Sequence, residues 1–134
     1  MFPQNTRILI IDDMPSIREL VKNTLKLMGY TQIIEAEDGV QGLKLLQQNV
    51  HEGTPVQLVI SDWNMPNMKG LELLKHIRST VEWAQLPFVL LTSESEREQV
   101  TEAVLAGVSQ YIVKPFSSQL FEDKLKAAYQ KHHK

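Results

Sequence analysis

The 134-residue sequence contains no cysteine. This absence excludes disulfides, thiolate metal sites and cysteine nucleophiles, and with them several classes of enzyme. An excess of charge of one sign is also lacking, because 14 basic side chains against 16 acidic ones leave a formal net charge of -2. Such a balance gives no global field that would attract nucleic acid or anionic lipid. We therefore expect neither nucleic acid nor a membrane as a partner.

Long hydrophobic runs are missing as well. No stretch approaches the roughly 20 apolar residues of a membrane span, and the N-terminus lacks the pattern of a signal peptide. The composition, 43% hydrophobic and 22% charged, is ordinary for a folded globular chain and shows no low-complexity tract. These features predict a single cytoplasmic domain over residues 1–134, with no linker and no output domain.

Short apolar runs alternate with longer segments of helical period along the chain. The runs are rich in β-branched residues, as in strands covered on both faces, and comprise residues 8–11, 32–36, 58–60, 88–91 and 111–113. Each is followed by an amphipathic stripe, and Pro15 and Gly29 are suited to begin and end the first helix. Five β-α pairs with right-handed crossovers predict an α/β fold with a doubly wound, five-stranded parallel sheet.

Polar residues follow four of the predicted strands within two positions. Asp12 and Asp13 follow the first strand, Asp62 the third, Thr92 the fourth and Lys114 the fifth. Because ligands bind doubly wound sheets at the carboxyl ends of strands, these side chains can meet at one edge. Three carboxylates there repel one another by about 1 kcal/mol per pair at 4 Å in water. Lys114 supplies one compensating charge, and the oxygen-rich remainder suits magnesium better than zinc.

This combination of groups meets the requirements of phosphoryl transfer, where catalysis is mostly positioning and neutralisation of charge. Asp62 can attack phosphorus and become a transient aspartyl phosphate, and Thr92 can donate its hydroxyl to an anionic oxygen. Taken alone, an Asp pair after a strand is more often a helix cap or a turn, and Thr92 could simply cap a helix. Asp62 and Lys114 at matching strand ends favour the functional interpretation.

Five short motifs lie in order along the chain, namely Ile11–Asp13, Glu35–Gly39, Ile60–Met68, Gly70–Leu74 and Tyr111–Phe116. In these motifs and their spacing the sequence resembles the receiver domains of response regulators, most closely the chemotaxis regulators of the CheY type. The similarity covers nearly the whole chain. It implies the flavodoxin-like, CheY-like strand order 2-1-3-4-5, with five helices flanking the sheet.

The resemblance also implies the identity of the phosphoacceptor and of the metal ligands. Asp62 would accept the phosphoryl group. Asp13, Asp62 and the backbone carbonyl of Asn64 would bind Mg²⁺ directly, and Asp12 would act mainly through a bound water.

Further roles at the same edge follow from the resemblance. Thr92 and Lys114 would contact phosphoryl oxygens, and the bond between Lys114 and Pro115 would be cis. Thr92 and Tyr111 would form the switch, because the hydroxyl moves inward on phosphorylation and the aromatic ring fills the space it leaves. Asn64 and Glu94 would tune the rate of dephosphorylation.

The implied output is a binding surface on the fourth helix, fifth strand and fifth helix, formed by Glu96, Val100, Val104, Tyr111 and Lys124. The implied partners are a histidine kinase as phosphodonor and a separate effector, which in chemotaxis is the flagellar motor switch. The chain would be a monomer. It would catalyse its own phosphorylation and dephosphorylation without being a dedicated turnover enzyme.

Two residues depart from the family pattern. Lys69 stands where an Asp is usual, which adds positive charge near the metal site without removing a ligand. Glu96 stands where a Lys is common, which reverses charge on the surface that would contact the flagellar switch and leaves the effector open. His51, His76, His132 and His133 have no mutual spacing typical of a metal site, and we expect them at the solvated surface.

Three alternatives compete with a chemotaxis output protein. A phosphorelay intermediate has the same sequence features. A phosphatase of the haloacid dehalogenase type also uses an Asp nucleophile at a strand end, but it needs a second Asp two residues later, where this chain has Asn64. A flavin carrier of the same fold is disfavoured because the loop after the first strand is acidic, whereas a flavin phosphate needs hydroxyls and free amides.

Overall fold

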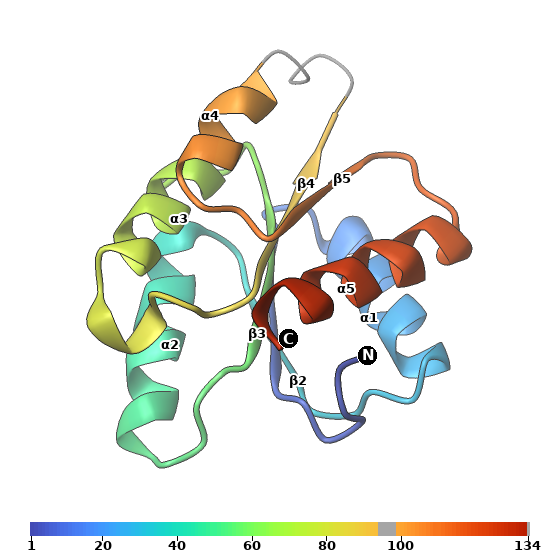
Figure 1. The fold of residues 1–134 in the computed structure, drawn as a ribbon, viewed down its shortest axis with the longest axis horizontal. Helices are drawn as coiled ribbons and strands as arrows, with labels where there is room; N and C mark the ends of the chain where they lie inside the picture. The colour runs from blue at the N-terminus through green and yellow to red at the C-terminus, as the bar shows by residue number, and fades with distance from the viewer. Residues whose placement is uncertain (94–98, 134) are drawn as a thin grey trace.

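Five parallel strands form the centre of the molecule in the computed structural model, which describes residues 1–93 and 99–133. The strands are β1 (Ile8–Ile11), β2 (Ile33–Ala36), β3 (Leu58–Asp62), β4 (Phe88–Thr92) and β5 (Gln110–Val113). Their order across the sheet is β2-β1-β3-β4-β5 (Figure 1). This is the order that the resemblance implies, and the predicted strand ends differ from the observed ones by at most two residues.

Helices cover both faces of the sheet. They are α1 (Pro15–Leu27), α2 (Gly39–His51), α3 (Gly70–Arg78), α4 (Val100–Leu105) and α5 (Ser118–His132), with a 3₁₀ turn η1 (Val81–Trp83) before β4. Figure 1 shows α2, α3 and α4 on one side and α1 and α5 on the other. The doubly wound α/β fold predicted from the sequence is therefore confirmed.

Alternation along the strands divides the core into two layers. In β1, Leu9 and Ile11 pack into the layer under α2 and α3, whereas Ile8 and Ile10 pack into the layer under α1 and α5. All four side chains are fully buried. Successive strand residues point to opposite faces, so a strand covered on both sides must be apolar throughout. This is why the sequence shows continuous apolar runs rather than alternation.

Local signals define the helix ends. Pro15 is at the first turn of α1, and Gly29, with φ of 99°, follows its end as the sequence predicts. The Asp38 side chain accepts a hydrogen bond from the Gln41 amide at 2.8 Å and so caps α2. The buried face of α1 is narrow, because Val21, Thr24 and Leu25 are buried whereas Leu20 at the margin of the helix is 49% exposed.

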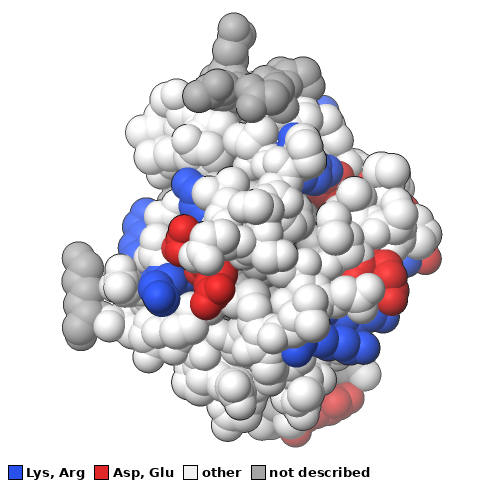
Figure 2. Space-filling view, turned by 90° about the vertical axis from the view of Figure 1, so that its right-hand side faces the viewer, with Lys and Arg blue, Asp and Glu red and all other residues white. Residues whose placement is uncertain are grey.

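Charged side chains of both signs lie close together on the face shown in Figure 2, with larger uncharged areas between them. Among the described residues, no helix combines the length and the hydropathy needed to cross a bilayer.

Candidate functional site

Three carboxylates meet at the carboxyl edge of the sheet. Asp12 and Asp13 follow β1 and Asp62 ends β3, and one carboxylate oxygen from each lies within 4.8 Å of the others. Asp12 is fully buried, Asp62 is 6% exposed and Asp13 is exposed. The parallel pairing of β1 with β3 brings these residues together although they are far apart in sequence. The acidic cluster predicted from strand ends is therefore present.

Lys114 brings a positive charge to this cluster. Its Nζ donates a hydrogen bond to Oδ1 of Asp62 at 3.0 Å. Its backbone amide donates to the carbonyl of Thr92 at 2.7 Å, which ties the end of β5 to the end of β4. The peptide bond between Lys114 and Pro115 is cis, as the resemblance implies. The Lys114 ammonium therefore pairs with Asp62, in a cluster that holds two further carboxyl groups.

The buried carboxylate of Asp12 is only partly hydrogen-bonded among the described residues. Its Oδ1 accepts a hydrogen bond from the Met14 amide at 2.9 Å, whereas its buried Oδ2 has no partner among the described residues. Burial raises the pKa of Asp12 to about 6, and the charges of Asp62 and Asp13 act in the same direction. The Met14 amide and Lys114 oppose this shift. An orphaned buried oxygen within an all-oxygen donor set fits a hard divalent cation such as Mg²⁺.

Thr92 is at the end of β4, in the strand next to Asp62. Its side chain is fully buried, and its hydroxyl has no hydrogen-bond partner among the described residues. A buried hydroxyl without a partner is unfavourable by about 1–3 kcal/mol. A buried hydroxyl of this kind destabilises the fold. It is typical of a residue that forms its hydrogen bond only in another conformational state.

The remaining predicted site residues lie around this edge. Asn64 is exposed in the loop after β3. Tyr111 is partly buried in β5, and the Lys124 ammonium lies 4.9 Å from the centre of its ring. Glu94 and Glu96 lie outside the described residues.

The α4 part of the predicted output surface is partly apolar. Val104 is 56% exposed, and Val100 is partly buried. Lys69 is exposed at the N-cap of α3, where its amide donates to Oε1 of Glu72 at 3.4 Å. The Lys69 side chain therefore brings its charge to the start of α3.

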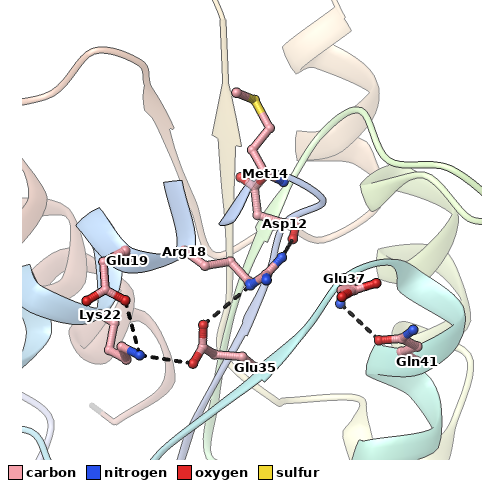
Figure 3. Close-up of polar contacts among 8 residues, drawn as sticks. All are labelled: Asp12, Met14, Arg18, Glu19, Lys22, Glu35, Glu37 and Gln41. Atoms are coloured by element: carbon pink, nitrogen blue, oxygen red, sulfur yellow. Dashed lines mark hydrogen bonds and ion pairs between the residues drawn. The ribbon is translucent and has the colours of Figure 1, made fainter. Parts of the chain in front are cut away.

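Two contacts near the acidic cluster are not predicted from the sequence. Arg18 of α1 donates to the backbone carbonyl of Asp12 at 2.6 Å and pairs with Glu35 at 3.3 Å (Figure 3). Asn67 donates to Asp38 at 2.7 Å and so connects the loop after β3 to the cap of α2.

The expectation that all four histidines lie at the solvated surface is wrong for His132. Its Nε2 lies 2.7 Å from the hydroxyl of Ser109, and its Nδ1 is buried without a partner among the described residues. Burial lowers the pKa of His132, and the positive charge of Arg78 adds to this shift. The last turn of α5 packs on the start of β5, and the sequence pattern gave no sign of this contact.

Residues 8–126 match the family described as the response regulator receiver domain. The chain belongs to this family. The receiver domain is 41% identical over 128 residues to chemotaxis protein CheY-3 of Vibrio cholerae, covering 96% of this chain and 95% of that protein. It is also 40% identical over 119 residues to a chemotaxis protein CheY homologue of Campylobacter jejuni, covering 89% and 88% of the two chains.

Solved structures show the same receiver architecture. Chemotaxis response regulator CheY4 of Vibrio cholerae superposes with a TM-score of 0.81 at 31% identity, covering 92% of this chain and 98% of that one. A response regulator of Chloroflexus aurantiacus gives a TM-score of 0.85 at 25% identity, with 94% and 98% coverage. Both the sequence and the fold therefore place the receiver domain among CheY-like response regulators.

Proposed function

We propose that this receiver domain is a phosphorylation switch in which Asp62 accepts a phosphoryl group from a phosphohistidine of a histidine kinase. The observation that carries the proposal is the position of the Asp62 carboxylate. It lies within 4.8 Å of two other carboxylates and 3.0 Å from the Lys114 ammonium. A carboxylate in this setting can be both nucleophile and cation ligand.

The transfer is a substitution at phosphorus. A carboxylate oxygen of Asp62 forms the new bond to phosphorus, the bond to the histidine nitrogen breaks, and that nitrogen keeps the electron pair. Lys114 and the hydroxyl of Thr92 stabilise the negative charge on the phosphoryl oxygens. Attack of water on phosphorus later restores the carboxylate and releases inorganic phosphate. Asn64 and Glu94 set the rate of that step. The domain thus modifies itself and is not a dedicated turnover enzyme.

The residues that would hold Mg²⁺ are Asp13, Asp62 and the backbone carbonyl of Asn64, with Asp12 acting through a bound water. When bound, Mg²⁺ neutralises charge on the transferring group and on the carboxylates. The buried Oδ2 of Asp12, which lacks a partner among the described residues, supports this ligand set.

The output is a change in the surface formed by α4, β5 and α5. Phosphorylation supplies an acceptor for the Thr92 hydroxyl, which moves toward it, and Tyr111 then occupies the vacated space. Exposed Val104 and the Lys124 ammonium above Tyr111 give this surface a mixed apolar and cationic character. Because two relatives carry the name of chemotaxis proteins, the proposed effector is the flagellar motor switch.

The experiment supplies acetyl phosphate with and without Mg²⁺ and measures the mass of the intact protein. We expect one added phosphoryl group that requires Mg²⁺ in the wild type and is absent in Asp62→Asn. Lys114→Ala should still be labelled but should transmit less to the Tyr111 surface. Labelling that persists in Asp62→Asn would place the acceptor elsewhere. Transfer from the labelled protein to a second histidine protein would indicate a phosphorelay intermediate instead of an output protein.

A further inference from the structure

Arg18 lies between the acidic cluster and the edge strand β2. Its side chain is 14% exposed and extends from near the start of α1. Nη1 donates to the backbone carbonyl of Asp12 at 2.6 Å, and Nε pairs with Oε1 of Glu35 at 3.3 Å. Figure 3 shows the guanidinium directed toward both groups. One side chain therefore joins α1, β2 and the segment that leaves β1.

The carbonyl that Arg18 contacts belongs to the peptide unit joining Asp12 to Asp13. The other side of Asp12 is held by its amide, which donates to the Ala36 carbonyl at 3.1 Å. Asp13 is exposed, so packing does not fix its carboxylate. The hydrogen bond from Arg18 fixes the plane of the peptide that leads into Asp13, and this plane sets the direction in which that side chain leaves the backbone.

Glu35 keeps the guanidinium in this orientation. Its Oε1 faces Arg18, and its Oε2 faces the ammonium of Lys22 at 3.2 Å. Lys22 also pairs with Glu19 at 3.2 Å, so the ionic network continues along α1 and away from the acidic cluster. A planar guanidinium can span two acceptors with separate nitrogens, which a single ammonium cannot do in the same geometry.

We propose that Arg18 is a positioning residue for the metal. By clamping the carbonyl of Asp12, it orients the carboxylate of Asp13 toward Asp62 and strengthens the binding of Mg²⁺. The inference rests on the proposed function, because it concerns the ion that phosphoryl transfer to Asp62 uses.

The direction in which loss of Arg18 changes the affinity for Mg²⁺ distinguishes a positioning role from a purely electrostatic one. A positive charge beside the acidic cluster repels Mg²⁺, so loss of the Arg18 charge alone would tighten binding. Loss of the clamp weakens binding, because groups that orient metal ligands typically contribute 10–100-fold to metal affinity. The proposal requires that the weakening from the lost hydrogen bond exceed the tightening from the lost positive charge.

The test is a calorimetric titration of the folded, unphosphorylated protein with Mg²⁺ in the absence of any phosphodonor. We expect the dissociation constant of Arg18→Ala to rise about tenfold. Arg18→Lys keeps the charge but loses the planar fork, so it should also bind more weakly. The matched control is Lys22→Ala, which removes a cation from the same Glu35 but lies outside the contacts of Asp12. It should bind Mg²⁺ as tightly as the wild type, or slightly more tightly.

Unchanged or tighter binding in Arg18→Ala overturns the inference, and so does equal weakening in Lys22→Ala, which would assign the effect to the ionic network as a whole. If Arg18→Ala does not fold, the Mg²⁺ affinity of Arg18→Lys tests the inference in the same way. Wild type that binds Mg²⁺ but is never labelled by acetyl phosphate contradicts the proposed function and leaves this inference standing. Wild type that does not bind Mg²⁺ contradicts both.

Discussion

The Nζ of Lys114 lies 3.0 Å from Oδ1 of Asp62, although 52 positions separate the two residues in sequence. The carboxylate side chain is 8% exposed and the lysine side chain 23% exposed, so the pair is largely shielded from water. The lysine is thus a counter-ion for a site with more acid than it can neutralise. Removal of the lysine should lower the stability of the protein and raise its affinity for Mg²⁺.

Lys114→Met keeps the length of the side chain and removes its charge. Breaking a buried ion pair from one side costs about 3–5 kcal/mol, and partial exposure of the lysine reduces this to about 1–3 kcal/mol. Urea unfolding without Mg²⁺ should show that loss. Added Mg²⁺ should stabilise the variant more than the wild type, because the competing cation is gone. Equal stability of the two proteins without Mg²⁺ would contradict the role of Lys114 as the main counter-ion.

Mg²⁺ should raise the melting temperature of the wild type, because the carboxylates are gathered only in the folded state. At 100 times the dissociation constant the gain is about 2.7 kcal/mol. Asp13→Asn should lose most of this gain in a thermal melt with and without Mg²⁺. Asp123→Asn is the control, since Asp123 is an exposed carboxylate on α5 that bonds to Gln119. A similar loss in both variants would point to nonspecific ion binding.

Thr92→Val should stabilise the protein and silence the switch. The hydroxyl is fully buried without a partner among the described residues, so its replacement by a methyl group should add about 1 kcal/mol to the free energy of unfolding. Thr24→Val is the matched control, because the Thr24 hydroxyl donates to the Leu20 carbonyl at 2.8 Å and its loss should destabilise. Equal destabilisation of both variants would mean that the Thr92 hydroxyl is already satisfied.

His132 should make stability depend on pH near neutrality. Its pKa is lowered in the folded state from 6.5, so the unfolded chain binds the proton more readily. Stability is therefore highest above pH 6.5 and falls as the pH drops through this value toward the folded-state pKa. Arg78, Lys131 and His133 are the charged groups that oppose protonation.

The measurement is the difference in unfolding free energy between the wild type and His132→Gln at pH 7.5 and pH 5.5, about one unit to either side of the ordinary pKa of histidine. The wild type should lose more stability on acidification than the variant. Asp12 changes stability in the opposite direction, because its pKa is raised to about 6, so the difference between variants is the informative quantity. His76→Gln, which changes an exposed histidine, should follow the wild type. Parallel profiles for wild type and His132→Gln would contradict burial of a neutral ring.

The sheet and the acidic cluster were predictable because both depend on periodicity and on the ends of apolar runs. Asp12, Asp62 and Lys114 directly follow or end such runs, and parallel pairing then brings them to one edge. The contact of Arg18 with a backbone carbonyl depends on how α1 crosses the end of β1, which no residue pattern encodes. The partial burial of His132 depends likewise on the docking of the last turn of α5 beside Ser109.

Gly70 begins α3 directly against the backbone of Asp62. Its amide donates to the Trp63 carbonyl at 3.0 Å, and a Cβ at this position would overlap the Asp62 carbonyl oxygen. The end of β3 that bears Asp62 and the start of α3 are thus in direct backbone contact. Because a side chain cannot be accommodated at Gly70, we expect any rearrangement around Asp62 to be taken up in β4 and β5, where the Thr92 hydroxyl lacks a partner among the described residues and Tyr111 is only partly buried.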